Sequence, residues 1–511
     1  MNPLPNNWIT YTLNELLLTL ESGSRPRGGV KGICEGVPSI GGEHLTCDGT
    51  FDFTRIKFVP RDFADRMSKG HIQKYDILIV KDGATTGKTA FVDDNFPYET
   101  AVVNEHVFIC RVSEVISPKF VFRYLMSEEG RNEILRNFQG SAQGGINSSF
   151  ASNVEVPLAP VNEQHRILAK LEKLLTKVDN CKERLDRIPV ILKRFRQSVL
   201  AAACSGRLTA DWREKNPDVE PASELLRRIK KERMKQQCRE NNVKARVDVK
   251  YTAKRDAQDL PVIPISWAYT YLGNIIFSFQ YGTSEKSDYS FEGIPVLRIP
   301  NLVSMGIDLR DLKYLKRNDI DDNHKVRNGD LLIVRSNGSR ELIGKSALVQ
   351  NLTGKMAFAS YLIRLRPLVV LSEYVLLLLN TEYIKSQFFS KAKSTAGINN
   401  INTKELSSTI IPLPPLEEQL EIVRRVEALF KIADQVEARY EKAKAYVDRL
   451  TQAIFAKAFR GELVPQDPDD EPASVLLERI REERARREAE LRTAGRRRQL
   501  PARRRKKAGK L

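Results

Sequence analysis

The chain has 511 residues, of which 41% are hydrophobic, and a formal net charge of +18. This length predicts two or more domains with separate cores, and no apolar run is long enough to span a membrane. No secretory signal is evident at the start, and the six scattered cysteines form no C-x-x-C pair, so we expect a reduced, cytoplasmic protein with no metal site.

The excess of positive charge predicts a polyanionic partner, and it is concentrated at one end. Residues 492–511 hold ten Lys or Arg and no acidic residue, which leaves +8 on the remaining body. We expect a disordered basic tail over 492–511 that adds non-specific attraction to phosphates. A tail that only aids solubility is the alternative.

The first globular region covers residues 1–158, where short strand-like runs alternate with turn residues and a helical stretch follows. The segment "YDILIVKDGATTGKTAFV" (75–92) contains the G-K-T of a phosphate-binding loop. However, Gly83 and Gly87 are separated by three residues, one fewer than that loop needs, and the following residues are typical of a strand rather than a helix. Strand, turn and strand predict a β-hairpin.

The sequence contains an internal repeat that covers most of the chain. Six motifs of the first half return in the same order 251 to 259 residues later, including "PLAPVNEQ" (157–164) as "PLPPLEEQ" (412–419) and "EPASELLRRIKKER" (220–233) as "EPASVLLERIREER" (471–484). The second globular region is 261–412. Its hairpin tip has five residues between Gly338 and Gly344, and such a change of length suits a hairpin but not a phosphate cradle. The ATP interpretation therefore fails.

Helical regions follow each globular region, at 159–235 and 413–491, and a polar linker at 236–260 joins the two copies. In both regions apolar residues recur in alternating steps of four and three, the seam of a coiled coil. The positions are Ile167, Leu171, Leu174, Val178, Cys181, Leu185, Ile188, Leu192, Phe195 and Val199, and Ile422, Val426, Leu429, Ala433, Val436, Tyr440, Ala443, Val447, Leu450 and Ile454.

Equal length and phase favour pairing of the two helices, although each helix could instead pack on its own globular region. Pro189 lies inside the first seam and should kink the helix or interrupt a hydrogen bond. Glycines in "SGRL" (205–208) and "RGEL" (460–463) stand where the helices should end.

Signatures of common catalytic sites are missing from the sequence. There is no G-x-G and no E-x-K triplet, and the five histidines show no metal spacing. We therefore expect a chain that is not catalytic by itself, with an α+β (mixed) fold: two similar recognition domains separated by two long paired helices, related by a pseudo-two-fold internal repeat.

In each copy a globular region ends in "PLxPxxEQ" and is followed by a long helix and then "EPASxLL". This doubled order resembles the specificity (S) subunit of type I restriction–modification enzymes, over residues 1 to about 490. The resemblance implies that 1–158 and 261–412 are target recognition domains for the two halves of a bipartite double-stranded DNA site. It implies an antiparallel coiled coil that fixes the spacer and docks two methyltransferase (M) subunits, with two restriction (R) subunits joining the complex. S-adenosylmethionine, ATP and Mg would then bind the partners of a DNA adenine methyltransferase and ATP-dependent endonuclease. The Arg-rich tail and Pro189 depart from this pattern.

Hairpin tips and Gly-rich loops are the expected DNA contacts, because loops on a rigid framework carry adaptable side chains. The candidates are Lys81, Thr85, Thr86, Lys88, Gln143 and Asn147 in the first domain and Arg335, Asn337, Ser339, Arg340 and Asn399 in the second. Each could instead be a solvated loop residue or a phosphate contact. The two tips differ in sequence, which predicts unlike half-sites. A coiled-coil scaffold for acidic protein partners is the competing hypothesis.

Overall fold

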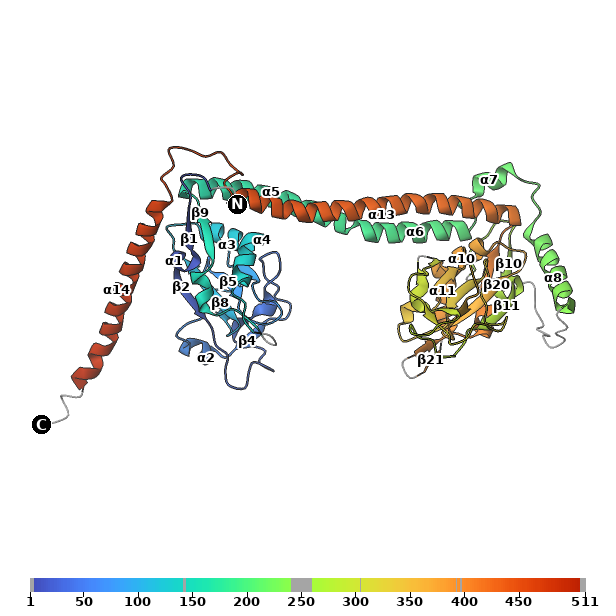
Figure 1. Ribbon diagram of the computed structural model, residues 1–511, viewed down its shortest axis with the longest axis horizontal. Helices are drawn as coiled ribbons and strands as arrows, with labels where there is room; N and C mark the ends of the chain where they lie inside the picture. Colours follow the sequence, from blue (N-terminus) through green and yellow to red (C-terminus); the bar gives the residue numbers. More distant parts are fainter. Residues whose placement is uncertain are drawn as a thin grey trace. The chain divides into compact units, whose positions relative to one another are not determined.

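A computed structural model describes residues 4–140, 144–239, 260–303, 305–391, 393–395 and 398–505. The chain divides into two compact units. Unit 1 comprises Met1–Leu185 and Lys442–Leu511, and unit 2 comprises Asp186–Glu441. Each unit contains one globular domain and helical segments from both copies of the repeat (Figure 1).

The first domain combines an antiparallel sheet of order β2-β8-β5-β6 with a smaller sheet of order β4-β3-β7 and the pair β1-β9. Its strands are β1 Ile9–Thr12, β2 Leu17–Ser22, β3 Val37–Ile40, β4 Lys57–Val59, β5 Ile77–Val80, β6 Thr89–Phe91, β7 Val102–Val103, β8 Val107–Val112 and β9 Glu155–Leu158. Its helices are α1 Leu13–Leu16, α2 Arg61–Arg66, α3 Pro118–Met126 and α4 Glu128–Leu135.

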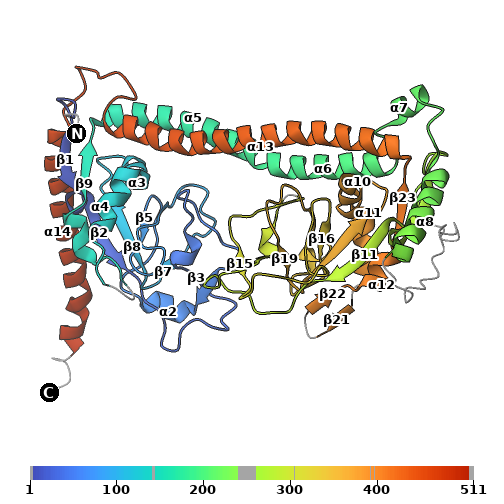
Figure 2. The ribbon, with the colours of Figure 1, turned by 45° about the vertical axis from the view of Figure 1, so that its right-hand side comes forward.

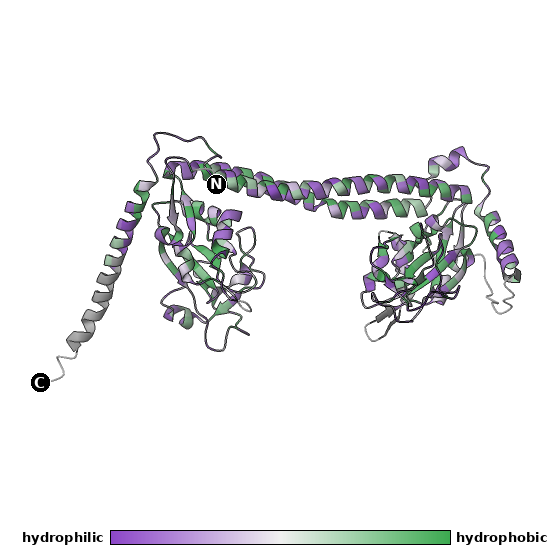
Figure 3. Cartoon of the chain, viewed as in Figure 1, coloured by the Kyte–Doolittle hydropathy of each residue, from purple (hydrophilic) through white to green (hydrophobic). Residues whose placement is uncertain are grey.

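Strand β5 shows why this sheet is covered on both faces. Successive side chains of a strand point to opposite faces, and all four residues of "ILIV" are buried. Ile77 and Ile79 join the core formed with α3, while Leu78 and Val80 join a second core with Ile40. Hydrophobic residues accordingly concentrate on the strands inside each domain (Figure 3).

The second domain repeats this plan, with sheets of order β11-β20-β16-β18 and β15-β12-β19 and the pair β10-β23. Its strands are β10 Ala268–Tyr271, β11 Ile276–Tyr281, β12 Pro295–Leu297, β13 Leu302–Val303, β14 Gly306–Ile307, β15 Lys313–Tyr314, β16 Leu331–Val334, β17 Ser336–Asn337, β18 Ser346–Leu348, β19 Ala357–Phe358, β20 Leu362–Pro367, β21 Lys393–Thr395, β22 Ile398–Asn400 and β23 Ile410–Leu413. Its helices are α9 Leu272–Ile275, α10 Ser372–Leu379, α11 Glu382–Lys391 and α12 Thr403–Ser407. The predicted pair of similar mixed domains is confirmed.

The long helices are α5 Val161–Asp186, α6 Ile188–Cys204 and α13 Leu416–Phe459. The predicted first seam is interrupted between α5 and α6. Pro189 occupies the first turn of α6, where a backbone N–H has no acceptor within the helix, so its missing N–H removes no helical hydrogen bond. Gly206 and Gly461 follow the ends of α6 and α13 with φ of 75° and 73°, the left-handed conformation that glycine favours at a helix end. These helix ends lie where the sequence predicts them.

The helices run antiparallel within each unit. In unit 2, Arg196 of α6 bonds Asp434 and Glu437 of α13 at 2.7 and 2.8 Å. Further along the chain, the carbonyl oxygen of Leu208 accepts a hydrogen bond from Arg425, which lies earlier in α13. The first segment therefore advances as α13 is followed backwards. In unit 1, Lys182 of α5 lies 3.8 Å from Asp448 of α13.

The seam residues pack on the domains as well as on the opposite helix. Both predicted arrangements, helix pairing and packing of each helix on a globular domain, are therefore present at the same time. Leu171 and Val178 are buried, and Leu174, Val447 and Leu450 half-buried, in one core with the first domain. Val426 is buried and Leu429 half-buried in the core of the second domain. Leu192 is buried and Leu185 half-buried.

Two seam predictions are wrong. Cys181 is exposed, and Val436 is 39% exposed. Arg196 explains Val436: this charged side chain, rather than an apolar one, meets α13 at that level, because it pairs with Asp434 and Glu437 on either side of Val436. A heptad period identifies a face of the helix but not the residues opposite it.

The ends of the helical regions cross over between the copies. Helices α7 Ala210–Lys215 and α8 Ala222–Arg239, from the first copy, belong to the unit of the second domain, and α14 Ser474–Arg505, from the second copy, belongs to that of the first. Ala222 N–H donates to Ser266 O at 2.9 Å, and Ala473 N–H donates to Asn7 O at 3.0 Å. Figure 2 shows α8 beside the second domain and α14 beside β1.

Two predicted boundaries need correction or lie outside the described residues. Helix α14 continues to Arg505, so the disordered tail predicted over 492–511 is wrong for 492–505. Arg, Ala, Leu and Gln in this stretch are good helix formers, whereas Gly495 and Pro501 oppose the helix. Extending an existing helix costs less than starting one. Residues 506–511 are outside the described part, as are 240–259 of the predicted linker. Among the described helices, none is long and apolar enough to cross a lipid bilayer.

Candidate nucleic-acid interface

The predicted hairpins are present in both domains. β5 pairs antiparallel with β6, and β16 pairs antiparallel with β18. In the first tip Gly83 and Gly87 have φ of 86° and 82°, a conformation that side chains rarely adopt. A strand follows each tip, so the helix N-terminus that a phosphate loop requires is absent from these described segments.

In the first tip, Lys81 is the side chain best placed to meet a ligand. Its N–H donates to His106 O at 2.9 Å, and its half-buried side chain places Nζ 5.7 Å from the centre of the Phe108 ring. Thr85 is half-buried. Lys88 Nζ lies 3.4 Å from the Leu45 carbonyl oxygen.

Thr86 is an incorrect prediction for a DNA contact. Its side chain is buried, and its hydroxyl donates to Gly83 O at 2.7 Å. A buried hydroxyl that already has an acceptor stabilises the tip rather than meeting a ligand.

The second predicted loop of the first domain lies against the tip. Ile146 N–H donates to Lys81 O at 2.7 Å, and Gly83 N–H donates to Gly144 O at 3.3 Å. Asn147 is exposed and its Oδ1 accepts from Ser149 N–H at 2.9 Å. Gln143 lies outside the described residues. A polar cavity of about 580 Å³ is lined by residues of both the tip and the loop, including Lys81, Gln139 and Asn147, and by Lys69.

The second domain brings the equivalent segments together. Arg335 N–H donates to Tyr361 O at 2.9 Å, and Ile401 N–H donates to Arg335 O at 2.9 Å. Asn337 faces Asn399 across the β17–β22 ladder. Asn337 Oδ1 accepts from Ser339 N–H at 2.7 Å, while Ser339 and Arg340 are exposed.

The two sites therefore share a backbone frame but carry different side chains. Matching strand registers place Lys81 with Arg335, His106 with Tyr361 and Ser22 with Tyr281. Neither His106 nor Tyr361 belongs to the tip motifs, so these motifs do not indicate them. Aligning the two copies through β8 and β20 would have shown that this position changes from one half to the other.

Electrostatics also differ between the two tips. In the first, His106 Nδ1 lies 2.5 Å from Asp82 Oδ1, and His106 Nε2 lies 3.3 Å from Glu105 Oε1. In the second, the register replaces these acids with serines, Ser336 and Ser360. Tyr361 is 57% exposed. The first tip is thus mixed in charge, and the second is neutral or basic at the same places.

A buried ion pair supports each hairpin. Arg111 of β8 bonds Asp76 at 2.8 Å, and Arg366 of β20 bonds Asp330 at 2.8 and 2.9 Å. Burial raises the pKa of Asp76, against the opposing effect of Arg111. Because each acid directly precedes the strand that leads to the tip, these pairs hold the tip in position.

The repeated "EQ" of "PLxPxxEQ" attaches each long helix to its domain. Trp8 Nε1 donates to Glu163 Oε2 at 3.0 Å, and Trp267 Nε1 donates to Glu418 Oε2 at 2.7 Å. The buried Gln that follows each Glu accepts a backbone N–H from its domain, from Ser117 at 3.0 Å and from Leu371 at 3.1 Å. Burial raises the pKa of Glu163.

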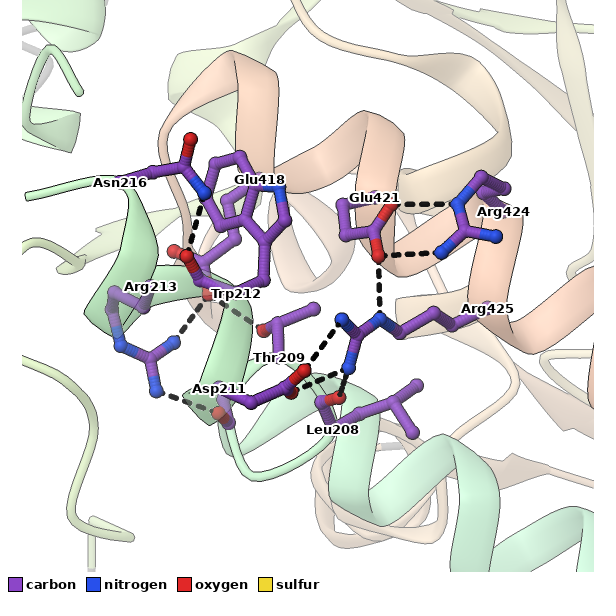
Figure 4. Close-up of polar contacts among 11 residues, drawn as sticks. Leu208, Thr209, Asp211, Trp212, Arg213, Asn216, Glu418, Glu421, Arg424 and Arg425 are labelled. Atoms are coloured by element: carbon purple, nitrogen blue, oxygen red, sulfur yellow. Dashed lines mark hydrogen bonds and ion pairs between the residues drawn. The ribbon is translucent and has the colours of Figure 1, made fainter.

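Figure 4 shows the polar network at the start of α13. Glu418 also accepts from Thr209 Oγ1 at 2.7 Å and from Arg213. Arg425 bonds Asp211 at 2.6 and 3.0 Å and Glu421 at 2.5 Å. The hydrogen bond from Arg425 lowers the pKa of Asp211 to about 2. Hydrogen bonds from Arg424, then Arg425, lower the pKa of Glu421 to about 2.

The repeated segments 220–233 and 471–484 each end in an arginine that meets a short helix of the neighbouring domain. Arg233 of α8 donates to the carbonyl oxygens of Gly273, Asn274 and Ile276 at 2.7 to 3.0 Å. Arg484 of α14 donates in the same way to Asn14 and Leu17. A cation at the C-terminal end of a helix is electrostatically favourable. Within the described residues, no group of three or more His, Cys, Asp or Glu is arranged to hold a metal ion.

Comparison with known proteins agrees with this architecture. Residues 32–190 and 266–444 match the family described as "Type I restriction modification DNA specificity domain". The chain is 32% identical over 452 residues to the type I restriction enzyme EcoKI specificity subunit of Escherichia coli (strain K12), covering 86% of this chain and 87% of that protein. It is 30% identical to the StySPI specificity subunit of Salmonella potsdam over the same shares.

Solved structures show the same fold at lower identity. A chain from work on complex assembly and conformational transition of the type I R-M system has a TM-score of 0.65 at 20% identity, covering 90% of this chain and 100% of the other. The HsdS subunit from Thermoanaerobacter tengcongensis has a TM-score of 0.51 at 19% identity, covering 90% and 98%. Two repeated recognition domains on antiparallel helices define a DNA specificity protein. The chain belongs to the family of type I restriction enzyme specificity subunits.

Proposed function

We propose that this chain selects the DNA target of a type I restriction–modification complex by reading a bipartite, asymmetric double-stranded site. One observation carries the proposal: the same backbone frame occurs in both domains and presents different side chains at the same places. Lys81 and Arg335 have equivalent hydrogen bonds through N–H and C=O, yet their surroundings differ in shape and charge. A common backbone frame with different side chains suits the recognition of two different short base sequences.

We propose further that the helices dock two M subunits and set the spacer between the half-sites. The apolar side chains of Val190, Ile191 and Ile432 are 52%, 60% and 55% exposed on α6 and α13, and exposed apolar groups of this size on paired helices favour a protein partner. α13 is one uninterrupted helix of 44 residues, which supports a spacer of fixed length.

In this proposal the chain itself performs no chemistry. S-adenosylmethionine, ATP and Mg bind to the M subunits and to two R subunits, which together make a cytoplasmic DNA adenine methyltransferase and ATP-dependent endonuclease. The absence of a nucleotide loop at the hairpin tips supports this division of labour.

Binding to duplex DNA tests the proposal against the alternative of a coiled-coil scaffold for acidic proteins. Because each neutralised phosphate releases counterions, the logarithm of affinity should fall linearly with the logarithm of salt concentration. We expect filter binding to mixed-sequence duplex DNA to show this dependence, and Arg340→Ala to reduce the slope by about one phosphate contact. No binding by the full-length chain at low salt would favour the scaffold.

A further inference from the structure

Arg335 differs from the other half-buried or buried arginines of the second domain in having no protein acceptor. Among the described residues its guanidinium makes no hydrogen bond or ion pair, and its Nε is buried without a partner. Its neighbours in the domain are paired with carboxylate or carbonyl oxygens: Arg298 with Asp311, Arg310 with Asp308, Arg317 with Glu285, Arg364 with Asp322 O and Arg366 with Asp330. An unpaired guanidinium that is half-buried loses hydration without compensation, unless a ligand supplies the acceptors.

The guanidinium is nevertheless held in place. Its central carbon lies 4.6 Å from the centre of the Tyr281 ring, and the Tyr281 hydroxyl accepts from Thr403 N–H at 3.3 Å. The backbone of Arg335 is fixed on both sides by its bonds to Tyr361 and Ile401. Stacking on an aromatic ring therefore orients a planar group at the base of the hairpin tip.

We propose that Arg335 is the guanine-reading residue of the second domain, making paired hydrogen bonds to O6 and N7 in the major groove. The inference rests on the proposed function. The planar fork of arginine matches these two acceptors, and this is the commonest specific contact between a side chain and a base. At the equivalent place Lys81 carries a point charge over Phe108, and Ser22 stands where Tyr281 supplies the stacking ring. The first domain therefore offers no ring-stacked guanidinium at this place.

The test uses the full-length chain and a duplex that contains its mapped target site. Each guanine of the half-site read by the second domain is replaced in turn by 7-deazaguanine, which lacks the N7 acceptor. At one guanine we expect wild-type affinity to fall about 10-fold or more, within the 1–3 kcal/mol of a paired base contact. Arg335→Lys keeps the charge but loses the fork, so it should bind the natural site less tightly and respond little to 7-deazaguanine.

Three variants separate base reading from general effects. Tyr281→Phe keeps the ring and should discriminate like the wild type, while Tyr281→Ser removes the ring and should discriminate less. Arg340 is exposed and lies 5.3 Å from the Phe389 ring. Arg340→Ala should weaken specific and scrambled duplexes alike, with the response to 7-deazaguanine unchanged.

The outcomes distinguish this inference from the proposed function. A half-site without a G·C pair, or an Arg335→Lys chain that responds to 7-deazaguanine as strongly as the wild type, overturns the guanine assignment while specific binding remains. A wild-type chain that binds the mapped and scrambled duplexes equally overturns the proposed function itself.

Discussion

At the scale of single residues, the chain relies on a few buried polar groups that recur in both halves. Glu418 is fully buried and accepts hydrogen bonds from Trp267, Thr209 and Arg213. These partners come from two segments that are distant in sequence from Glu418 and from each other: Thr209 and Arg213 at α7, and Trp267 at the start of the second domain. A single carboxylate therefore joins the second domain, the end of the first helical region and the start of α13.

Removing the Glu418 carboxylate should strongly destabilise unit 2. Glu418→Ala leaves a guanidinium, an indole N–H and a hydroxyl without their acceptor, and losing one member of a buried ion pair costs about 3–5 kcal/mol. We expect a loss of about 3 kcal/mol in the free energy of unfolding in urea, accompanied by faster hydrogen exchange in α7. Glu418→Gln keeps an acceptor oxygen and should cost less. A change below about 1 kcal/mol for Glu418→Ala would contradict this role.

The sequence indicated which segments carry the candidate site but not how each side chain is used. Lys81 and Arg335 were predicted from their position at hairpin tips, and the structure places them at equivalent points of the frame. Thr86 looked equally suitable because its burial depends on the fold of the tip. His106 and Tyr361 directly precede β8 and β20, and Tyr281 ends β11, so they reach the tip only through sheet pairing, which periodicity does not reveal.

At the scale of elements, the hairpins, the long helices and the helix ends at Gly206 and Gly461 follow from local signals. Glycine conformation and apolar spacing are local properties, so they can be read directly. The exchange of α8 and α14 between the copies could not be predicted, because it depends on long-range packing of surfaces. Val436 shows a related limit: the heptad spacing predicts that it is buried, but the opposite helix places the charged Arg196 at that level.

The ion pairs that attach α7 to α13 should make unit 2 sensitive to acid. The pKa of Asp211 is about 2 in the folded chain, below its usual value of about 4. An acid with a lowered pKa stabilises the fold above its unfolded pKa, and this contribution is lost as the pH falls through the folded pKa. Because Asp211 is 61% exposed and solvent screens its pair with Arg425, wild type should exceed Asp211→Asn only slightly in unfolding free energy from pH 5 to 7, and the difference should disappear between about pH 4 and pH 2.

Asp218 offers a matched control for this prediction because it is an exposed acid nearby in the same unit. Asp218→Asn removes the same charge but leaves the Asp211–Arg425 pair in place, so its stability should follow the wild-type pH profile. Urea unfolding of the three chains at several pH values provides the measurement. Equal pH profiles for Asp211→Asn and Asp218→Asn would show that the pairing with Arg425 does not stabilise the junction.

At the scale of the whole molecule, the internal repeat does not coincide with the compact units. Each unit takes its domain from one copy and helical segments from both, so neither copy alone contains a complete unit. Repeated anchors make this possible: Trp8 with Glu163 and Arg484 with α1 in unit 1 match Trp267 with Glu418 and Arg233 with α9 in unit 2. Two equivalent frames then differ mainly in the side chains at their tips.

The central claim is that these two frames read two unlike DNA words. The most direct measurement is to co-express the chain with its cognate M subunit and to map newly methylated bases by long-read sequencing. The account predicts a split motif, in which two different short words are separated by a gap of constant length. Two identical words, a single uninterrupted word, or no new methylation from an assembled complex would contradict it.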